Sequence, residues 1–135
     1  MPIFYQRLKE GKKCFVTDAR RDFVFGNDLA KISLLAIDGV GKGSYHFSSG
    51  KDVTIKELYD EVVKSLGINP YPEPEIKKLN KDDVKSILLD PKRTFKDFGD
   101  IEFTSLSEIV STAVDYYDKH GTLGEYTHLN LKKSE

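Results

Sequence analysis

The sequence predicts a small mixed α/β domain with more helix than strand, and three observations support this fold class. A chain of 135 residues with 39% hydrophobic side chains suits a single domain with one core. Short runs of β-favouring residues, such as Phe23, Val24 and Phe25, lie next to turn-forming residues. Longer segments repeat their apolar residues at helical spacing. We therefore expect short strands and about five to six helices.

The N-terminal segment predicts a short helix followed by two strands. Pro2 suits the first turn of a helix, and Gly11 suits its end. Alternating residues favour a strand at 13–16, and the aromatic and β-branched run favours a second strand at 23–25.

A second helix is expected directly after that strand, because Asn27 or Asp28 can cap its first turn and Gly39 can end it. Its predicted buried stripe consists of Leu29, Ile32, Leu35 and Ala36.

The glycine-rich run at 39–44 invites comparison with a phosphate-binding loop. Such a loop follows a strand and precedes a helix, whereas here a helix is expected before the run and a strand, at 44–47, after it. A helix-to-strand connector fits this order of elements. His46, within the expected strand, has no histidine or cysteine at metal-ligand spacing and is read as an ordinary strand residue.

The clearest helix signal is a capping box, in which Thr54 and Glu57 satisfy each other's backbone amides. We expect a helix from Thr54 to about Leu66, ended by Gly67.

The remaining elements are predicted less sharply. Prolines 70, 72 and 74 indicate an extended segment that leads into an edge strand at 75–77. Residues 83–89 are expected to be irregular or helical, 91–98 helical, and a last long helix begins at Ser105 or Ser107. The expected domain covers 1–121, followed by a polar tail at 122–135.

Charge and cysteine content exclude several classes of function. The 21 basic and 22 acidic residues nearly cancel, so bulk charge does not predict binding to nucleic acid or to an anionic membrane. No apolar run reaches the roughly 18 residues that a membrane span needs. The single cysteine, Cys14, excludes an intrachain disulfide and suits a reducing compartment, so we expect a cytoplasmic protein.

One short motif suggests catalysis. Tyr5 and Lys9 form a Tyr-x-x-x-Lys pair, and on a helix the lysine charge can lower the pKa of the phenol. Short-chain dehydrogenases use such a pair together with a nicotinamide cofactor held by a glycine-rich loop after a strand. No such loop follows a strand in this sequence, so a free-standing enzyme ranks last among our hypotheses.

Four stretches together resemble a known family: PIFYQRLKEGKKCFVTDARRDFVFGNDLAKISLLAI, GSYHFSSGKDVTIKELYDEVVKSLG, DDVKSILLDPKRTFKDFG and IEFTSLSEIVSTAVDYYDKHG. They are similar, in order and spacing, to the C-terminal substrate-binding domain of extended short-chain dehydrogenase/reductases, the NAD-dependent sugar-nucleotide epimerases and dehydratases. The resemblance spans roughly residues 2–121. The tail at 125–129 also resembles an extension in bacterial members associated with surface-polysaccharide synthesis.

The resemblance implies a site for a nucleoside-diphosphate sugar. Arg21 stands where the family grips the diphosphate, and a guanidinium presents forked donors that suit phosphate oxygens. The alternative is that Arg20 and Arg21 form surface ion pairs with Asp18 or Asp22.

The same resemblance implies further contacts. Cys14, Phe15 and Val16 match the strand whose backbone meets the uracil or thymine edge. A second phosphate-binding arginine of the family corresponds here to Asn80, with Lys78 and Lys81 close by in sequence.

No catalytic, metal-binding or cofactor-binding residue is expected in this chain, although the resemblance implies NAD for a full-length parent enzyme. Beyond the nucleotide sugar, the expected partners are a separate Rossmann domain or a second copy of the chain. We expect an exposed apolar patch that includes Phe4, Tyr5 and Phe25 to face that partner. The competing hypothesis is an interaction module that keeps the fold, has lost its ligand and docks another polypeptide.

Overall fold

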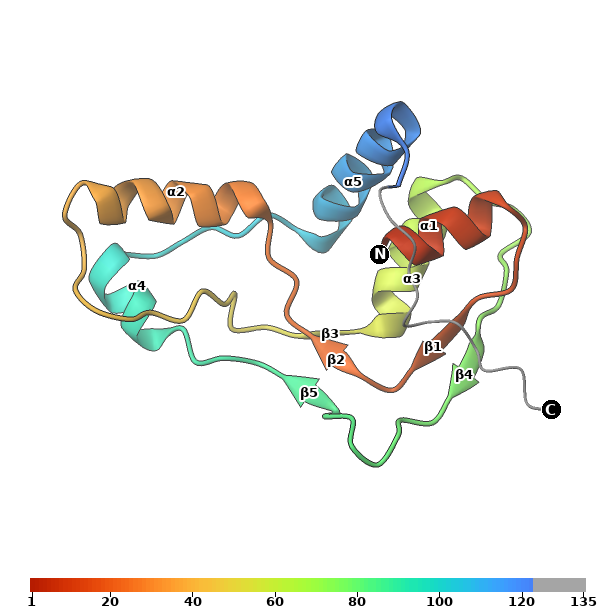
Figure 1. Cartoon of the computed structure of the whole chain (residues 1–135), viewed down its shortest axis with the longest axis horizontal. Helices are drawn as coiled ribbons and strands as arrows, with labels where there is room; N and C mark the ends of the chain where they lie inside the picture. Colours follow the sequence, from red (N-terminus) through yellow and green to blue (C-terminus); the bar gives the residue numbers. More distant parts are fainter. Residues whose placement is uncertain (123–135) are drawn as a thin grey trace.

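The computed structural model describes residues 1–122, so the tail at 125–129 and nearly all of the expected polar tail lie outside the described residues (Figure 1). In chain order the elements are α1 (Pro2–Lys9), β1 (Phe15–Thr17), β2 (Arg20–Arg21), α2 (Gly26–Ile37), β3 (Val53–Thr54), α3 (Ile55–Ser65), β4 (Glu75–Lys77), β5 (Ser86–Ile87), α4 (Lys92–Phe98) and α5 (Leu106–His120). Within the described part of the chain there are thus five helices and only short strands. The predicted mixed α/β class is confirmed.

Two small sheets join distant parts of the sequence. β1 pairs in parallel with β4, and Val16 lies opposite Ile76. β2 is the central strand of the other sheet, antiparallel to β3 and parallel to β5. Residues around 15–21 are therefore held by residues around 75–87.

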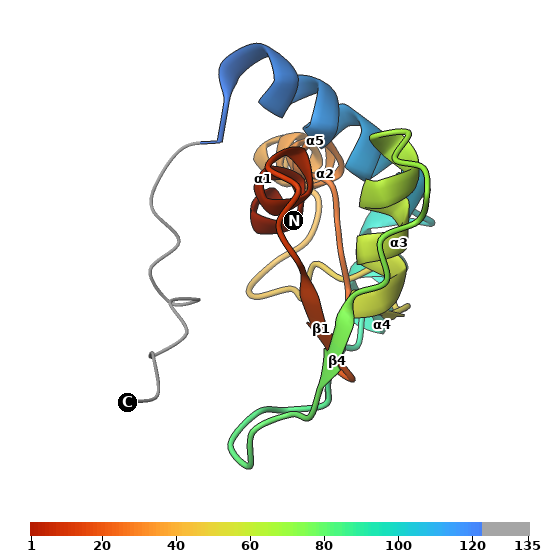
Figure 2. The same cartoon turned by 90° about the vertical axis from the view of Figure 1, so that its right-hand side faces the viewer.

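The core lies where α1, α3 and α5 meet β1. Figure 2 shows α5 crossing above α1 and α3, with β1 and β4 below them. The fully or almost fully buried members of this cluster include Phe4, Tyr5, Leu8, Cys14, Val16, Leu58, Tyr59, Val62, Val63, Val110 and Val114. The capping box predicted at the start of α3 is present: Thr54 Oγ1 accepts from the Glu57 amide, and the Glu57 carboxylate accepts from the Thr54 amide.

Because Phe4 and Tyr5 belong to this core, the expected exposed patch of Phe4, Tyr5 and Phe25 is wrong. The physical reason is that α1 turns its apolar face onto α3 and α5 of the same domain. The ring of Phe4 meets that of Tyr59 edge-on, with centroids 5.3 Å apart.

Helix α2 lies apart from the core and corrects a second expectation (Figure 1). Of its predicted buried stripe only Ile32 is buried, while Leu29, Leu35 and Ala36 are exposed. Helical periodicity identified the helix correctly, but the face it marked is not covered by the described residues.

Two strand expectations are also wrong, and two short strands were not expected. Residues 23–25 and 44–47 run without strand pairing, whereas 20–21 and 86–87 pair. A strand exists only where another segment supplies partners, and here those partners are Val53, Thr54 and each other. The segment 83–89 is irregular, as expected, except that it contains the two-residue strand β5.

Candidate functional site

Arg21, the predicted diphosphate ligand, lies on β2 and forms no ion pair with another residue of the described range 1–122. Its Nη1 donates to the backbone carbonyls of Arg20, Val84 and Lys85, at 2.7, 3.1 and 3.4 Å. Among residues 1–122, no carboxylate forms an ion pair with Arg21, and no protein atom accepts a hydrogen bond from its Nε or Nη2. The carbonyls hold one side of the guanidinium, and the other donors remain available to an anion.

The alternative assignment, in which Asp18 or Asp22 neutralises the arginines, is wrong because both carboxylates have other partners. Asp18 pairs with Lys85 at 2.7 Å. Asp22 accepts hydrogen bonds from the hydroxyls of Ser48 and Ser49 and from the Ser49 amide.

Arg20 does form an ion pair, but with a residue that the sequence did not suggest. Its Nε lies 2.9 Å from Asp52 Oδ1, and its Nη2 donates to the Asp52 carbonyl at 2.8 Å. Hydrogen bonds from Ser86 and from Arg20 lower the pKa of Asp52. Arg20 thus ties β2 to the residue before β3, whereas Arg21 forms no ion pair with any other described residue.

The region of the second predicted phosphate site is a turn just before β5. The Asn80 amide donates to the Asp83 carboxylate at 3.2 Å, and the Asp83 amide donates to the Asn80 carbonyl at 3.1 Å. Lys81 is exposed and forms no ion pair with any other described residue. The turn leads directly into Val84, whose carbonyl binds Arg21.

Of the three residues predicted to bind the base, two line the same cavity and the third does not. Phe15 and Val16 line an apolar cavity of about 230 Å³ with Thr17 of the same strand, three residues of α1 and the first residue of α3: Ile3, Phe4, Arg7 and Ile55. Cys14 does not reach this cavity and instead lines a separate one of about 180 Å³. Burial raises the pKa of its thiol, as expected for an inert core cysteine.

Backbone geometry leaves one edge of β1 free beside the larger of these two cavities. The Cys14 carbonyl accepts from the Glu75 amide of the β4 side at 3.0 Å. Backbone groups of successive strand residues point to opposite edges, so those of Phe15 face away from β4. Among the described residues no strand pairs with that edge. Lys77 lies over the Phe15 ring, 4.2 Å from its centroid, and adds a positive charge near it.

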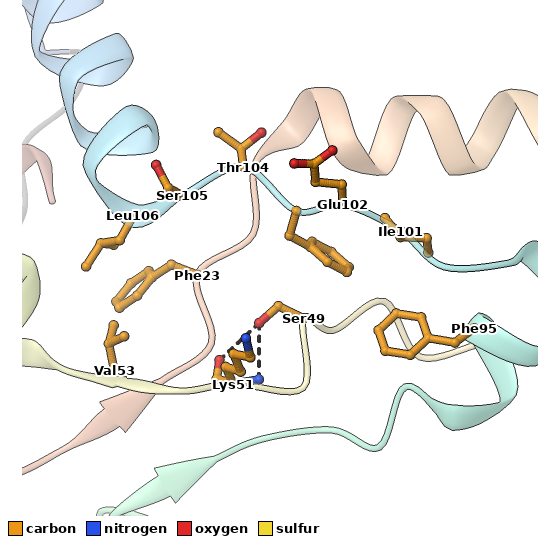
Figure 3. A pocket seen from close by; sticks show the side chains of 11 residues that line it. Phe23, Ser49, Lys51, Val53, Phe95, Ile101, Glu102, Thr104, Ser105 and Leu106 are labelled. Atoms are coloured by element: carbon orange, nitrogen blue, oxygen red, sulfur yellow. Dashed lines mark hydrogen bonds between the residues drawn. The ribbon is translucent and has the colours of Figure 1, made fainter.

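A larger cavity of about 500 Å³ escaped the sequence reasoning (Figure 3). The segments at 49–53 and 101–106 line it together with Phe23 and Phe95. Asp28 holds one wall in place, because its buried carboxylate accepts from the Thr104 amide at 2.8 Å and from the Thr104 hydroxyl at 3.1 Å. No local motif marks this cavity, since its walls come from segments about fifty residues apart.

The glycine-rich run at 39–44 follows α2 as a connector, but the strand expected directly after it at 44–47 is not formed. Arg93 donates to the carbonyls of Lys42 and Ser44, at 2.7 and 3.1 Å, and the Lys42 amide donates to the Tyr45 hydroxyl. An amide that a phosphate cradle would need is therefore already used within the protein. Among residues 1–122, no cluster of three potential metal ligands forms, at His46 or elsewhere.

Tyr5 and Lys9 come together, but not in a catalytic arrangement. The Tyr5 hydroxyl donates to Asp118 at 2.7 Å, and Lys9 pairs with the same carboxylate at 2.9 Å. The hydrogen bond to Asp118 raises the pKa of Tyr5, aided by burial and by the carboxylate charge. Because both side chains of α1 bind Asp118 of α5, this cluster joins the two helices.

The fold is that of the C-terminal domain of sugar-nucleotide epimerases. WbmH of Bordetella bronchiseptica, solved with NAD+, is 64% identical with a TM-score of 0.86, over 90% of this chain and 40% of WbmH. WbmG of the same organism, solved with NAD and UDP, is 34% identical with a TM-score of 0.82, over 89% and 39%. UDP-glucose 4-epimerase of Thermotoga maritima, solved with UDP-glucose, is 26% identical with a TM-score of 0.73, over 87% and 38%.

No protein-family profile matches the sequence, and no curated protein does. The chain spans about 40% of the length of the solved proteins it matches. The chain fits a fragment of the NAD-dependent sugar-nucleotide epimerases and dehydratases. In the part of the chain that the structure describes, no helix has the length and hydrophobicity of a membrane span.

Proposed function

We propose that this chain binds the nucleoside-diphosphate sugar of an NAD-dependent epimerase or dehydratase. The observation that carries the proposal is that Arg21 forms no ion pair within residues 1–122, where carbonyls hold its Nη1 and no described atom accepts from its Nε or Nη2. WbmG, which shares this fold, was solved with UDP.

In this proposal each predicted residue has a distinct role. Arg21 binds the diphosphate, and Lys81 contributes positive charge where Asn80 stands in place of an arginine. The free backbone edge of Phe15 meets the base, with Val16 forming the apolar floor. Cys14 acts only by keeping β1 paired with β4.

The chemistry of the parent reaction belongs, in this proposal, to the rest of such an enzyme. Hydride transfer would use NAD, and this chain would position the sugar without performing the reaction alone. A role in cytoplasmic polysaccharide synthesis is the corresponding biological proposal.

The test is titration of UDP and UDP-glucose into the purified chain, followed by calorimetry and amide chemical shifts. A hydrogen bond to a charged group contributes about 1.5–3 kcal/mol, so Arg21→Ala should weaken binding about 10- to 150-fold. Arg93→Ala is the matched control, because it removes an arginine that also donates to backbone carbonyls, at the distant 42–44 loop. Unchanged melting temperatures would show that both variants fold. Equal affinities of wild type and Arg21→Ala would refute the role of Arg21.

The second candidate is an interaction module that has lost its ligand. The substitution by Asn80 and the exposed apolar residues of α2 favour it. Absence of any shift change at millimolar UDP or UDP-glucose would favour this candidate over the first.

A further inference from the structure

The carboxylate of Asp52 connects the three strands of the sheet that carries Arg21. In this sheet β2 lies between β3 and β5 (Figure 1). Asp52 directly precedes β3, and its Oδ1 accepts from Arg20 Nε of β2 at 2.9 Å. Its Oδ2 accepts from the Ser86 hydroxyl of β5 at 2.5 Å. The Asp52 side chain is only 16% exposed, so water competes little for these contacts.

The contact with Ser86 affects the carbonyls that hold Arg21. β5 has only two residues, both exposed, and lies at the edge of the sheet. The carbonyls of Val84 and Lys85, which accept from Arg21 Nη1, belong to the two residues just before β5. Among residues 1–122, the bond from Ser86 to Asp52 is the only side-chain hydrogen bond that joins β5 to another segment. The place of these carbonyls therefore depends on strand pairing and on this one bond.

We propose that Asp52 is a positioning residue that fixes the guanidinium of Arg21 for a phosphate group. Asp52 holds β5 against β2, and β5 sets the place of the carbonyls that accept from that guanidinium. This inference rests on the proposed function, in which the ligand is the diphosphate of a nucleotide sugar. The negative charge of Asp52 by itself repels such a ligand. Its two possible effects on affinity therefore have opposite signs, because positioning raises affinity and charge lowers it.

The test is calorimetric titration of UDP into the purified chain and its variants. Asp52→Ala removes both side-chain contacts, so Arg21 must be immobilised when the ligand binds, and affinity should fall about 3- to 10-fold. Asp52→Asn should stay within about twofold of wild type, because its amide can accept from Arg20 and donate to the Ser86 hydroxyl. An affinity of Asp52→Ala equal to or higher than that of wild type would overturn the proposal.

Two control variants separate positioning from other effects. Asp18→Ala removes an exposed carboxylate that pairs with Lys85 at 2.7 Å, so UDP affinity should change by less than about twofold. In the Arg21→Ala background, the addition of Asp52→Ala should also change affinity by less than about twofold, since Asp52 acts through the side chain already removed. A further loss as large as that in the wild-type background would overturn the proposal.

A second measurement needs no ligand. In the nucleotide-free chain, the heteronuclear NOE of the Arg21 Nε–H group in NMR reports fast motion of the guanidinium. The NOE should be high in wild type and in Asp52→Asn and low in Asp52→Ala. The NOE of Arg93, which carbonyls hold at the distant 42–44 loop, should be the same in all three and shows that the fold is kept. Equal values for Arg21 in wild type and Asp52→Ala would overturn the inference. Failure of wild type to bind UDP would count against the proposed function, and the NOE would still decide the role of Asp52.

Discussion

The carboxylate of Asp28 is expected to be the anchor that attaches α2 to the segment before α5. It is 1% exposed and accepts two hydrogen bonds from Thr104 and one from Lys31, the last at 3.3 Å. Replacing it by asparagine keeps the shape but removes the negative charge, so that the two hydrogen bonds with Thr104 become neutral ones and the ion pair with Lys31 is lost. Hydrogen bonds to charged groups contribute about 1.5–3 kcal/mol each, whereas neutral ones contribute about 0.5–1.5 kcal/mol. We expect Asp28→Asn to destabilise this junction by about 2–3 kcal/mol.

The assay is hydrogen exchange of the Thr104 amide, followed by NMR. A loss of about 2–3 kcal/mol predicts exchange about 30- to 150-fold faster than in wild type. Lys31→Ala is the control, because it removes only a surface ion pair whose lysine is 73% exposed, and it should change exchange by less than about fivefold. Exchange in Asp28→Asn within threefold of wild type, or an equal effect of Lys31→Ala, would refute the reasoning.

The same contact predicts a pH dependence. Burial alone would raise the pKa of Asp28, but the hydrogen bonds from Thr104 and Lys31 outweigh burial and lower it. A carboxylate with a lowered native pKa stabilises the folded state above its unfolded pKa, about 3.9, and this stabilisation disappears as pH falls through the native value. The stability difference between wild type and Asp28→Asn should therefore be constant near neutral pH and shrink below about pH 4.

Two further perturbations test other parts of the structure. Gly41 has φ +79°, and a Cβ added in Gly41→Ala would lie 2.8 Å from the Phe98 ring, so we expect the free energy of unfolding in urea to fall by about 1–3 kcal/mol. Gly26→Ala is the control, because an added Cβ there meets no atom within 4 Å and should be neutral or stabilising. Equal effects of the two substitutions would contradict this account. Asp118→Asn should lower the pKa of Tyr5, because the bond to and the charge of Asp118 raise it in wild type. Lys9→Gln should raise the pKa of Tyr5, because the lysine charge lowers it. An NMR titration of labelled tyrosine measures both, and shifts of the same sign would be inconsistent with the contacts.

Local sequence signals predicted the elements that are stabilised locally. Thr54 and Glu57 form their capping box regardless of the rest of the chain, and Ser105 caps α5 by accepting from the Glu108 amide. Short strands are different, because β2 exists only where Val53 and Ile87 flank Arg21. The β-favouring run at 23–25 lacks such partners and stays unpaired.

The candidate site shows the same division. The resemblance to the family pointed to Arg21 as the diphosphate ligand, and the alternative was an ion pair with Asp18 or Asp22. Neither could show that Asp52 binds Arg20 while the carbonyls of Val84 and Lys85 bind Arg21, since these partners lie 32, 63 and 64 residues away in sequence. The exposure of α2 was also hidden, because periodicity reports which residues are apolar but not what covers them.

The pairing of early with late strands has a consequence for how the chain is made. β1 at residues 15–17 pairs with β4 at 75–77, and the hydrogen-bond partner of Tyr5 lies 113 residues further along the chain. Such long sequence separations give a high contact order and slow folding. A nascent chain that has left the ribosome only as far as α3 would still lack β4 and α5, so the core around α1, β1 and α3 would be completed only after α5 has emerged.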